Sequence, residues 1–446
     1  MVEEKGKQKA KGFLLTLVYA VIVHVLYLHF YGKVLAGSYD GKLFVYSFNM
    51  SKYYFAVLET LLIVFLIDKH VRRETMTDTA MVLLYYLYFI PGVTQQAATN
   101  MSWAYIAYFF VFMCFLEFWS VVLKARKGSV LVASLRSIRI NKGQMMAAMI
   151  LLAVGITVVL SFYTRTFFSF SRFMASLHDV YGVRAAASEA NFHWILVNFE
   201  YWAVYFMIFM LAYYSEKKKW WVVTVLLIAV GAMFVIQANR IFLFLAVVSI
   251  FLGLFRVENK GLIPLFAIAG VVLLADVMLF ENGSLITDMY RRYAVVPNRL
   301  GEQYFDFFLT HEPDYLRTQY ARVCDALGVY SPYYSPNIAH IIGRTYYGTN
   351  MGANTGMVGS AMFSFGWFGT IISSFGYVAS FRLFDSVSSG IRNKKMLMAV
   401  AITLVTIAIN TGYMLTNIFS LSYFLMLFLS ILLINYEDDR KEVPLT

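Results

Sequence analysis

Long apolar runs alternate with short polar segments along most of this chain. A helix needs about 20 mostly apolar residues to cross the hydrocarbon core of a bilayer. The apolar runs cover residues 12–31, 53–67, 79–93, 102–123, 145–163, 194–214, 220–236, 241–255, 262–280, 357–382, 396–412 and 418–436. The pattern predicts an all-α polytopic integral membrane protein with about 12 transmembrane helices, forming a single transmembrane domain over residues 1–446.

The composition supports this class. The chain is 60% hydrophobic and only 14% charged, whereas a soluble domain is about 45–50% apolar and about 25% charged. An ordinary soluble protein and a disordered protein are both excluded. Cys114 lies inside an apolar run and Cys324 is far from it in sequence, so the two cysteines do not indicate a disulfide framework.

The distribution of basic residues predicts the orientation. Twelve spans place both termini on one side, and cytoplasmic loops carry an excess of Lys and Arg. With both termini cytoplasmic, the inside segments hold 24 of the 37 basic residues and the outside segments hold 13. Most of the formal charge of +11 therefore reflects membrane topology, and binding to nucleic acid is not expected. The length of the first run predicts an uncleaved span.

Two connections on the predicted periplasmic side are long. They cover residues 164–193 and 281–356, and connections longer than about 15 residues are usually functional or disordered. Both are rich in Tyr, Phe and Trp, which argues against disorder. The sequence therefore predicts two ordered periplasmic loops that carry the function.

Arginine replaces lysine on the predicted outer face. All three outer lysines, Lys33, Lys42 and Lys52, precede the second span, and every later outer cation is Arg. Arg grips phosphate through a planar, bidentate fork, so the pattern favours an anionic, lipid-linked phosphate or diphosphate at this face. Pairing with nearby carboxylates is the alternative. The outer arginines are Arg165, Arg172, Arg184, Arg240, Arg291, Arg292, Arg299, Arg317, Arg322 and Arg344.

Ionisable residues also occur within the apolar runs. Arg240 lies between two of them, where a charge indicates function by default, although an Arg there can also reach the membrane interface or pair with a buried acid. Glu59 and Glu200 are candidates for a polar cavity, and Glu117 and Asp276 are equally candidates for contacts between helices.

The order of motifs after residue 287 resembles Wzy-type polymerases, which polymerise bacterial O-antigen and capsular polysaccharide repeat units. Three elements carry the resemblance: Arg291-Arg292 followed by Val296-Pro297, the element Met351-Gly-Ala-Asn354, and Phe365-Gly-x-x-Gly369 at the start of a span. The segment around Arg184 in the first long loop is similar to an Arg-bearing loop of that family.

The resemblance implies a glycosyltransferase of the inner membrane with a GT-C-like helical core. Such enzymes join oligosaccharide units carried on undecaprenyl diphosphate at the periplasmic face, without a nucleotide sugar or another cofactor. It also implies a protein partner that regulates chain length, and makes Asn354 a candidate substrate contact. Two alternatives stay open: an O-antigen ligase, and a flippase for lipid-linked oligosaccharides.

The residue chemistry independently fits transfer from a lipid diphosphate. Arginines can stabilise the charge that builds on the leaving diphosphate, and the outer loops contain no Asp-x-Asp and no close His/acid cluster, so we predict a metal-independent reaction. Arg184 is a predicted substrate contact. The predicted clamp for the leaving group consists of Arg240, Arg291, Arg292, Arg299 and Arg344.

A general base and a sugar groove complete the predicted site. Glu302 follows the Arg-rich run and is the first candidate base; His340, whose ordinary pKa is about 6.5, is the second, and Asp306 and His311 remain open. Tyr333 and Tyr334 lie mid-loop and are candidates for stacking on sugars. An aromatic belt at the membrane interface is the alternative for the loop tyrosines.

Overall fold

The computed structural model describes a helical protein. It covers residues 2–35, 45–124, 142–165, 168–178, 194–237, 240–255, 259–280, 284–388, 394–411, 423, 424 and 426–428. Regular structure in these ranges is helical throughout, with no β-strand. The prediction of a polytopic helical membrane protein is confirmed at this level.

Seven helical segments within the described residues are long and apolar enough to cross a membrane. Shorter apolar helices occupy Trp220–Ile236, Ile241–Phe255 and Met398–Asn410. The predicted run at 194–214 is helical, and the one at 418–436 lies mostly outside the described residues. The long segments are Ala10–His29, Met50–Val71, Met76–Ala98, Trp103–Val122, Gln144–Tyr163, Asn259–Leu279 and Met357–Val387.

Contacts divide the chain into two compact units, a division for which the sequence gives no signal. Unit 1 contains Met1–Lys124, Asn259–Arg382 and Leu404–Ile418. Unit 2 contains Ala125–Glu258, Leu383–Thr403 and Phe419–Thr446. Two of the boundaries fall within helices, one in α19 (Gly369–Ser388) and one in α20 (Lys394–Thr411).

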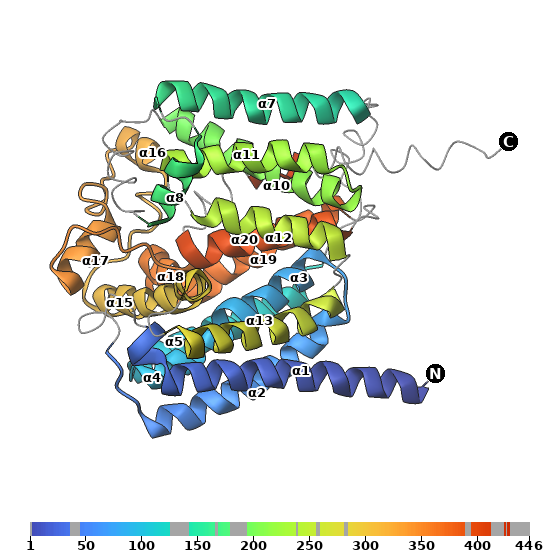
Figure 1. Ribbon diagram of the computed structural model, residues 1–446. Helices are drawn as coiled ribbons and strands as arrows, with labels where there is room; N and C mark the ends of the chain where they lie inside the picture. The colour runs from blue at the N-terminus through green and yellow to red at the C-terminus, as the bar shows by residue number, and fades with distance from the viewer. Residues whose placement is uncertain are drawn as a thin grey trace. The chain divides into compact units, whose positions relative to one another are not determined.

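Unit 1 is built on a set of long helices and a group of short ones. Helix α1 packs on both α2 and α13, as Figure 1 shows. The elements are α1 (Val2–His29), η1 (Tyr31–Leu35), α2 (Met50–Val71), α3 (Met76–Leu84), η3 (Tyr85–Phe89), α4 (Ile90–Ala98), α5 (Trp103–Val122), α13 (Asn259–Leu279), α14 (Leu285–Tyr290), η4 (Arg291–Val295), α15 (Val296–Thr310), α16 (Ala321–Ala326), α17 (Ile338–Tyr347), α18 (Met357–Phe365) and η5 (Gly366–Phe368).

Unit 2 is a helical bundle in which α10 packs against α7, α11 and α12 (Figure 1). The short helix α8 lies on α11. The elements are α7 (Lys142–Tyr163), α8 (Phe170–His178), α10 (Trp194–Glu216), α11 (Trp220–Gln237) and α12 (Arg240–Phe255).

Polar caps fix where three of the spans begin. The first backbone N–H groups of a helix lack partners within it, and a side-chain oxygen at the N-cap accepts from one of them. Asn49 accepts from the N–H of Lys52 at the start of α2, at 3.1 Å. Thr75 and Ser102 cap α3 and α5 in the same way. These caps define the first residues of the three helices.

The segment predicted as the second periplasmic loop contains short helices, joined by turns and irregular stretches, in its described part, residues 284–356. Helix α15 packs along α18, and its aromatic side chains Tyr304 and Phe308 contact Phe363 of that helix. Phe308 contacts both Tyr333 and Phe363, with ring centroids 5.4 Å apart in each case. The segment is therefore an integral part of unit 1, which accounts for its high content of aromatic residues.

Glycines at the two ends of α18 have identifiable structural roles, and Gly366 belongs to the Phe365-Gly-x-x-Gly369 element. A Cβ atom on Gly359 would lie 3.0 Å from the Cα of Gly301, so α15 and α18 touch through glycine. Gly366 has φ +57°, a conformation that side chains other than glycine's disfavour. It separates α18 from α19 within one predicted span. Both positions serve packing and chain direction.

One end of unit 1 holds a buried ionic group, which we call the His70 cluster: Lys69, His70, Asp78, Tyr85 and Glu117. The two ring nitrogens of His70 face Asp78 Oδ1 at 2.6 Å and Glu117 Oε2 at 2.8 Å. Because carboxylates accept hydrogen bonds, both nitrogens donate and the ring is positively charged. Lys69 and the Tyr85 hydroxyl also bind Glu117. The cluster joins α2, α3, η3 and α5, so Glu117 acts between helices.

The other acidic residues within the predicted spans differ in their hydrogen-bond partners. Asp276 accepts from the hydroxyl of Thr287 at 2.5 Å and from two backbone N–H groups that begin α14. It therefore joins α13 to α14. Glu59 is 3% exposed in α2, and neither of its carboxylate oxygens has a hydrogen-bond partner among the described residues. The side chain of Glu200 lies outside the described residues.

Candidate functional site

The candidate site lies at the end of unit 1 opposite the His70 cluster. Here α1 and α4 end while α2 and α5 begin. The N–H of Ser47 donates to the carbonyl of Ala98 at 2.9 Å, and the Lys52 ammonium donates to Asn100 Oδ1 at 2.6 Å. These contacts bring the residues that precede and begin α2 together with the residues between α4 and α5.

Helix α15 is anchored at the same end. The Asn298 amide donates to the carbonyls of Tyr88 and Ala294, at 3.2 and 2.7 Å. The hydroxyl of Tyr105 donates to the backbone carbonyl of Asn298 at 3.3 Å. Pro297 in the first turn costs no hydrogen bond, because the first N–H groups of a helix have no partner within it. These bonds fix α15 against α5 and η3.

Glu302 projects from α15 toward the start of α5. Its carboxylate accepts from the N–H of Ser102 at 3.2 Å and is paired with the guanidinium of Arg299. The Glu302 side chain is 15% exposed. Burial raises the pKa of Glu302, and the charge of Arg299 and the Ser102 hydrogen bond counteract only part of the increase. A carboxyl group in this position is suited to take up a proton closer to neutral pH than an exposed one.

Several polar side chains surround this carboxylate, and together we call them the Glu302 cluster. The charges of Lys52 and Arg299 act on Glu302, and those of Arg299 and Glu302 act on the buried hydroxyls of Tyr31 and Tyr347. The members are Tyr31, Lys52, Gln95, Ser102, Arg299, Glu302, Gln303 and Tyr347. They come from η1, α2, α4, the cap of α5, α15 and α17.

Part of the hydrogen-bonding capacity beside this cluster is unused. Gln95 donates to the Tyr31 hydroxyl at 3.2 Å, but its own side-chain oxygen has no partner among the described residues. The same holds for the amide nitrogen of Gln96 and the amide oxygen of Asn298. Buried polar atoms are nearly always hydrogen-bonded. These buried atoms therefore retain hydrogen-bonding capacity that no described group uses.

The structure separates the two neighbouring arginines of the motif. Arg291 donates to the carbonyls of Leu35 and Val34, at 2.8 and 2.7 Å, and to Asp288 at 2.6 Å, and its side chain is 11% exposed. Its bonds hold η1 against η4. Arg292 is exposed and has no hydrogen bond or ion pair within the described residues. Arg292 is the one of the two that is free to meet an anion.

Asn350 links two other predicted site residues. Arg344 is exposed on α17 and donates to Asn350 Oδ1 at 3.1 Å. His340 on the same helix donates through Nδ1 to the carbonyl of Asn350 at 3.0 Å. Asn354 is exposed four residues later. The predicted site residues Arg344, His340 and Asn354 thus share one surface segment, and Asn350 binds the first two of them.

The two mid-loop tyrosines occupy different environments. Tyr333 is buried, and its hydroxyl donates to the carbonyl of Glu312 at 2.7 Å. This position is typical of a core residue. Tyr334 is 59% exposed and is free to contact a ligand. His311 stacks on Phe307 with ring centroids 3.8 Å apart and hydrogen-bonds its backbone carbonyl.

Two predicted site residues belong to unit 2. Arg240 is the first residue of α12, and its side chain lies outside the described residues. Arg184 lies in the stretch 179–193, also outside the described residues. Their predicted contacts with a diphosphate stay predictions.

No pattern in the sequence connects Lys52, Tyr31 or Gln95 with Glu302. Lys52 was visible only as one of the three outer lysines, and the polar pair Gln95-Gln96 at the end of an apolar run was the one further signal. A comparison of the chain with protein-family models, curated proteins and solved structures finds no match.

Proposed function

We propose that this protein is a glycosyltransferase of the bacterial inner membrane that polymerises oligosaccharide units carried on undecaprenyl diphosphate. The reaction takes place at the periplasmic face and produces O-antigen or a related surface polysaccharide. Both termini are cytoplasmic in this proposal, and the Glu302 cluster lies at the periplasmic ends of the helices. The resemblance to Wzy-type polymerases supplies the reaction class.

The observation that carries the proposal is the environment of Glu302. A largely buried carboxylate with a raised pKa is paired with Arg299 and is also influenced by the charge of Lys52. Within the same cluster, the side-chain oxygen of Gln95 has no hydrogen-bond partner among the described residues. A base that activates a sugar hydroxyl needs this combination, because its pKa should lie nearer the working pH and its surroundings must receive a polar acceptor.

Two exposed arginines are available to bind the diphosphate of the lipid-linked donor. Arg292 and Arg344 are exposed, and no described carboxylate pairs with either of them. Each is free to contact the negatively charged diphosphate, and a guanidinium can do so through two parallel hydrogen bonds. Arg291 and Arg299 are engaged by protein groups, so we assign them positioning roles.

The proposed reaction is a single displacement at the anomeric carbon. Glu302 takes the proton of the acceptor hydroxyl at the sugar end of one lipid-linked unit. That oxygen forms a bond to the anomeric carbon of the growing chain. The bond between this carbon and the diphosphate oxygen breaks, and its electron pair leaves with the lipid diphosphate. Arg292 and Arg344 stabilise the charge on the leaving group.

Purified protein given only its lipid-linked repeat unit in detergent tests the proposal. The expected product is a ladder of glycans that differ by one repeat unit, on a gel or by mass spectrometry. Transfer of a finished glycan to lipid A without a ladder would identify a ligase. Movement of the lipid-linked unit across vesicle membranes without any new glycosidic bond would identify a flippase.

A further inference from the structure

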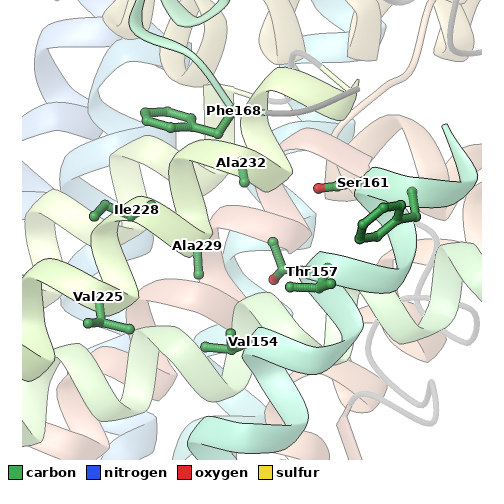
Figure 2. Close-up of a pocket in the computed structure, with 10 residues that line it drawn as sticks. Val154, Thr157, Ser161, Phe168, Val225, Ile228, Ala229 and Ala232 are labelled. Atoms are coloured by element: carbon green, nitrogen blue, oxygen red, sulfur yellow. The ribbon is translucent and has the colours of Figure 1, made fainter. Parts of the chain in front are cut away.

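An apolar groove lies within unit 2, between α7 and α11. Its volume is about 400 Å³. Figure 2 shows Val154 and Thr157 of α7 facing Val225, Ala229 and Ala232 of α11, with Phe168 beside one end. The remaining lining residues are Val158, Ser161, Phe162 and Ile228.

The groove opens on an exposed apolar surface. Helix α7 is one of the long apolar segments, and rim residues Val158, Phe162 and Ile228 are each about half exposed or more. Two hydroxyls lie in the lining, those of Thr157 and Ser161. The hydroxyl of Thr157 is already bonded to the carbonyl of Ala153 at 2.8 Å, and Ser161 is buried. The groove therefore offers contact to hydrocarbon and little else.

The length of the groove matches one leaflet of a bilayer. From Val154 to Phe162 the helix rises about 12 Å at 1.5 Å per residue, and half of the hydrocarbon core is about 15 Å. A volume of about 400 Å³ holds roughly thirteen groups of water or methylene size, at about 30 Å³ each. A single acyl chain fits these dimensions. A helix about 10–12 Å wide does not, and a long polyprenyl chain exceeds them.

Arg165 lies just beyond the C-terminal end of α7, next to the groove. The backbone N–H of Arg165 donates to the carbonyl of the lining residue Phe162 at 3.2 Å, in a turn where Arg165 has φ +52°. The Arg165 side chain is exposed and makes no hydrogen bond or ion pair within the described residues. An exposed Arg just beyond a hydrocarbon groove is placed to meet a lipid phosphate.

We propose that this groove binds one acyl chain of an anionic phospholipid of the surrounding bilayer, with the lipid phosphate at Arg165. The site is separate from the Glu302 cluster. Burial of the chain supplies hydrophobic stabilisation to α7 and α11, and the charge on Arg165 selects an anionic headgroup.

Photolabelling of the full-length protein tests this proposal. Protein in detergent receives phosphatidylglycerol with a photoreactive acyl chain, and labelled peptides are mapped by mass spectrometry. Labels are expected on residues 154–168 and 225–232. Ala232→Phe fills the groove and should abolish this labelling, whereas Val159→Phe, on an exposed position of α7 outside the groove, should preserve it. Val158→Trp blocks the exposed rim if Ala232→Phe fails to fold.

A second labelling experiment tests whether Arg165 recognises the lipid headgroup. Arg165→Gln should lower labelling by phosphatidylglycerol about fivefold, the effect of one cation near an anionic surface, and should not change labelling by a neutral diacylglycerol probe. Uniform labelling of all exposed helices, or equal labelling of both Phe variants, would overturn the proposal. Displacement of the label by equimolar undecaprenyl phosphate would reassign the groove to the polyprenyl carrier.

Discussion

The two ends of unit 1 both hold ionisable residues, but they differ in how completely those residues are paired. In the His70 cluster, both ring nitrogens and both carboxylates have partners, and His70 and Asp78 are each about 1% exposed. In the Glu302 cluster the carboxylate has two partners, while polar atoms of Gln95, Gln96 and Asn298 beside it have unused capacity.

This difference indicates that the His70 cluster stabilises the fold and that the Glu302 cluster serves activity. A buried ionic group is stable only when each charge is paired and hydrogen-bonded, and the His70 cluster meets that condition with protein groups alone. The Glu302 cluster meets it only in part, which is typical of a site completed by a ligand. We therefore expect changes at the first end to affect stability, and changes at the second to affect activity.

The largest expected effect is at Glu302. Glu302→Gln keeps the shape of the side chain but removes the base, so ladder formation should fall about 10²- to 10⁴-fold. The melting temperature should change little, because Gln can still accept from Ser102. Asp306→Asn, one turn further along α15 and exposed, is the matched control and should retain most of the activity. Equal losses in the two variants would contradict the assignment of the base.

The next effect is at His70. His70→Ala leaves the Asp78 and Glu117 carboxylates buried without their shared cation, which should cost about 3–5 kcal/mol of stability. Thermal unfolding in detergent measures this loss. Arg72→Ala, which removes an exposed ion pair with Asp68 near the same helix end, should cost at most about 1 kcal/mol. A His70→Ala protein that kept its stability and lost only activity would contradict the structural role of the His70 cluster.

The adjacent arginines test the same distinction within one motif. Arg291→Lys loses contacts to the carbonyls of Val34 and Leu35 and should destabilise the protein by about 1–3 kcal/mol. Arg292→Lys should leave the melting temperature unchanged and lower activity roughly tenfold, as expected for one lost hydrogen bond to a charged group. Unchanged activity in Arg292→Lys would remove this residue from the proposed clamp.

The smallest expected effect is in the pH dependence. Glu302 must be ionised to act as a base, so activity should rise with pH through its raised pKa, above the ordinary value of about 4.3 for Glu. Because the folded-state pKa is raised, the stability that Glu302 contributes is greatest at low pH and is lost as pH rises through that pKa.

The comparison variant is again Glu302→Gln, which does not titrate at this position. Melting temperatures of the two proteins, measured between pH 4 and pH 8, should favour the wild type most at the acidic end. A difference that grows with pH instead would mean that ionisation of Glu302 stabilises the folded protein.

The spans were predictable because their cause is local. In a bilayer each backbone polar group must be satisfied within its own helix, so an apolar run of sufficient length predicts a helix by itself. The runs at 12–31, 102–123, 145–163 and 262–280 correspond to α1, α5, α7 and α13. The short helices within 284–356 were not predicted, since they depend on contacts with one another, with α13 and with α18.

The candidate site was predictable only in part. The sequence drew attention to Glu302 and to the Arg-rich run, because charges after a span are conspicuous. It assigned Arg291 and Arg299 to a diphosphate clamp, whereas the structure engages the first with Val34, Leu35 and Asp288 and the second with Glu302. These partners include carbonyls more than 250 residues away, which no local pattern reveals.

The sequence by itself determined that the chain is a helical membrane protein, because hydrophobic length and backbone satisfaction in lipid are properties of each segment. Only the tertiary structure decided which charges are used. Whether a guanidinium or a carboxylate is free for a ligand depends on the groups brought to it by distant helices, and pairing within the fold competes directly with binding.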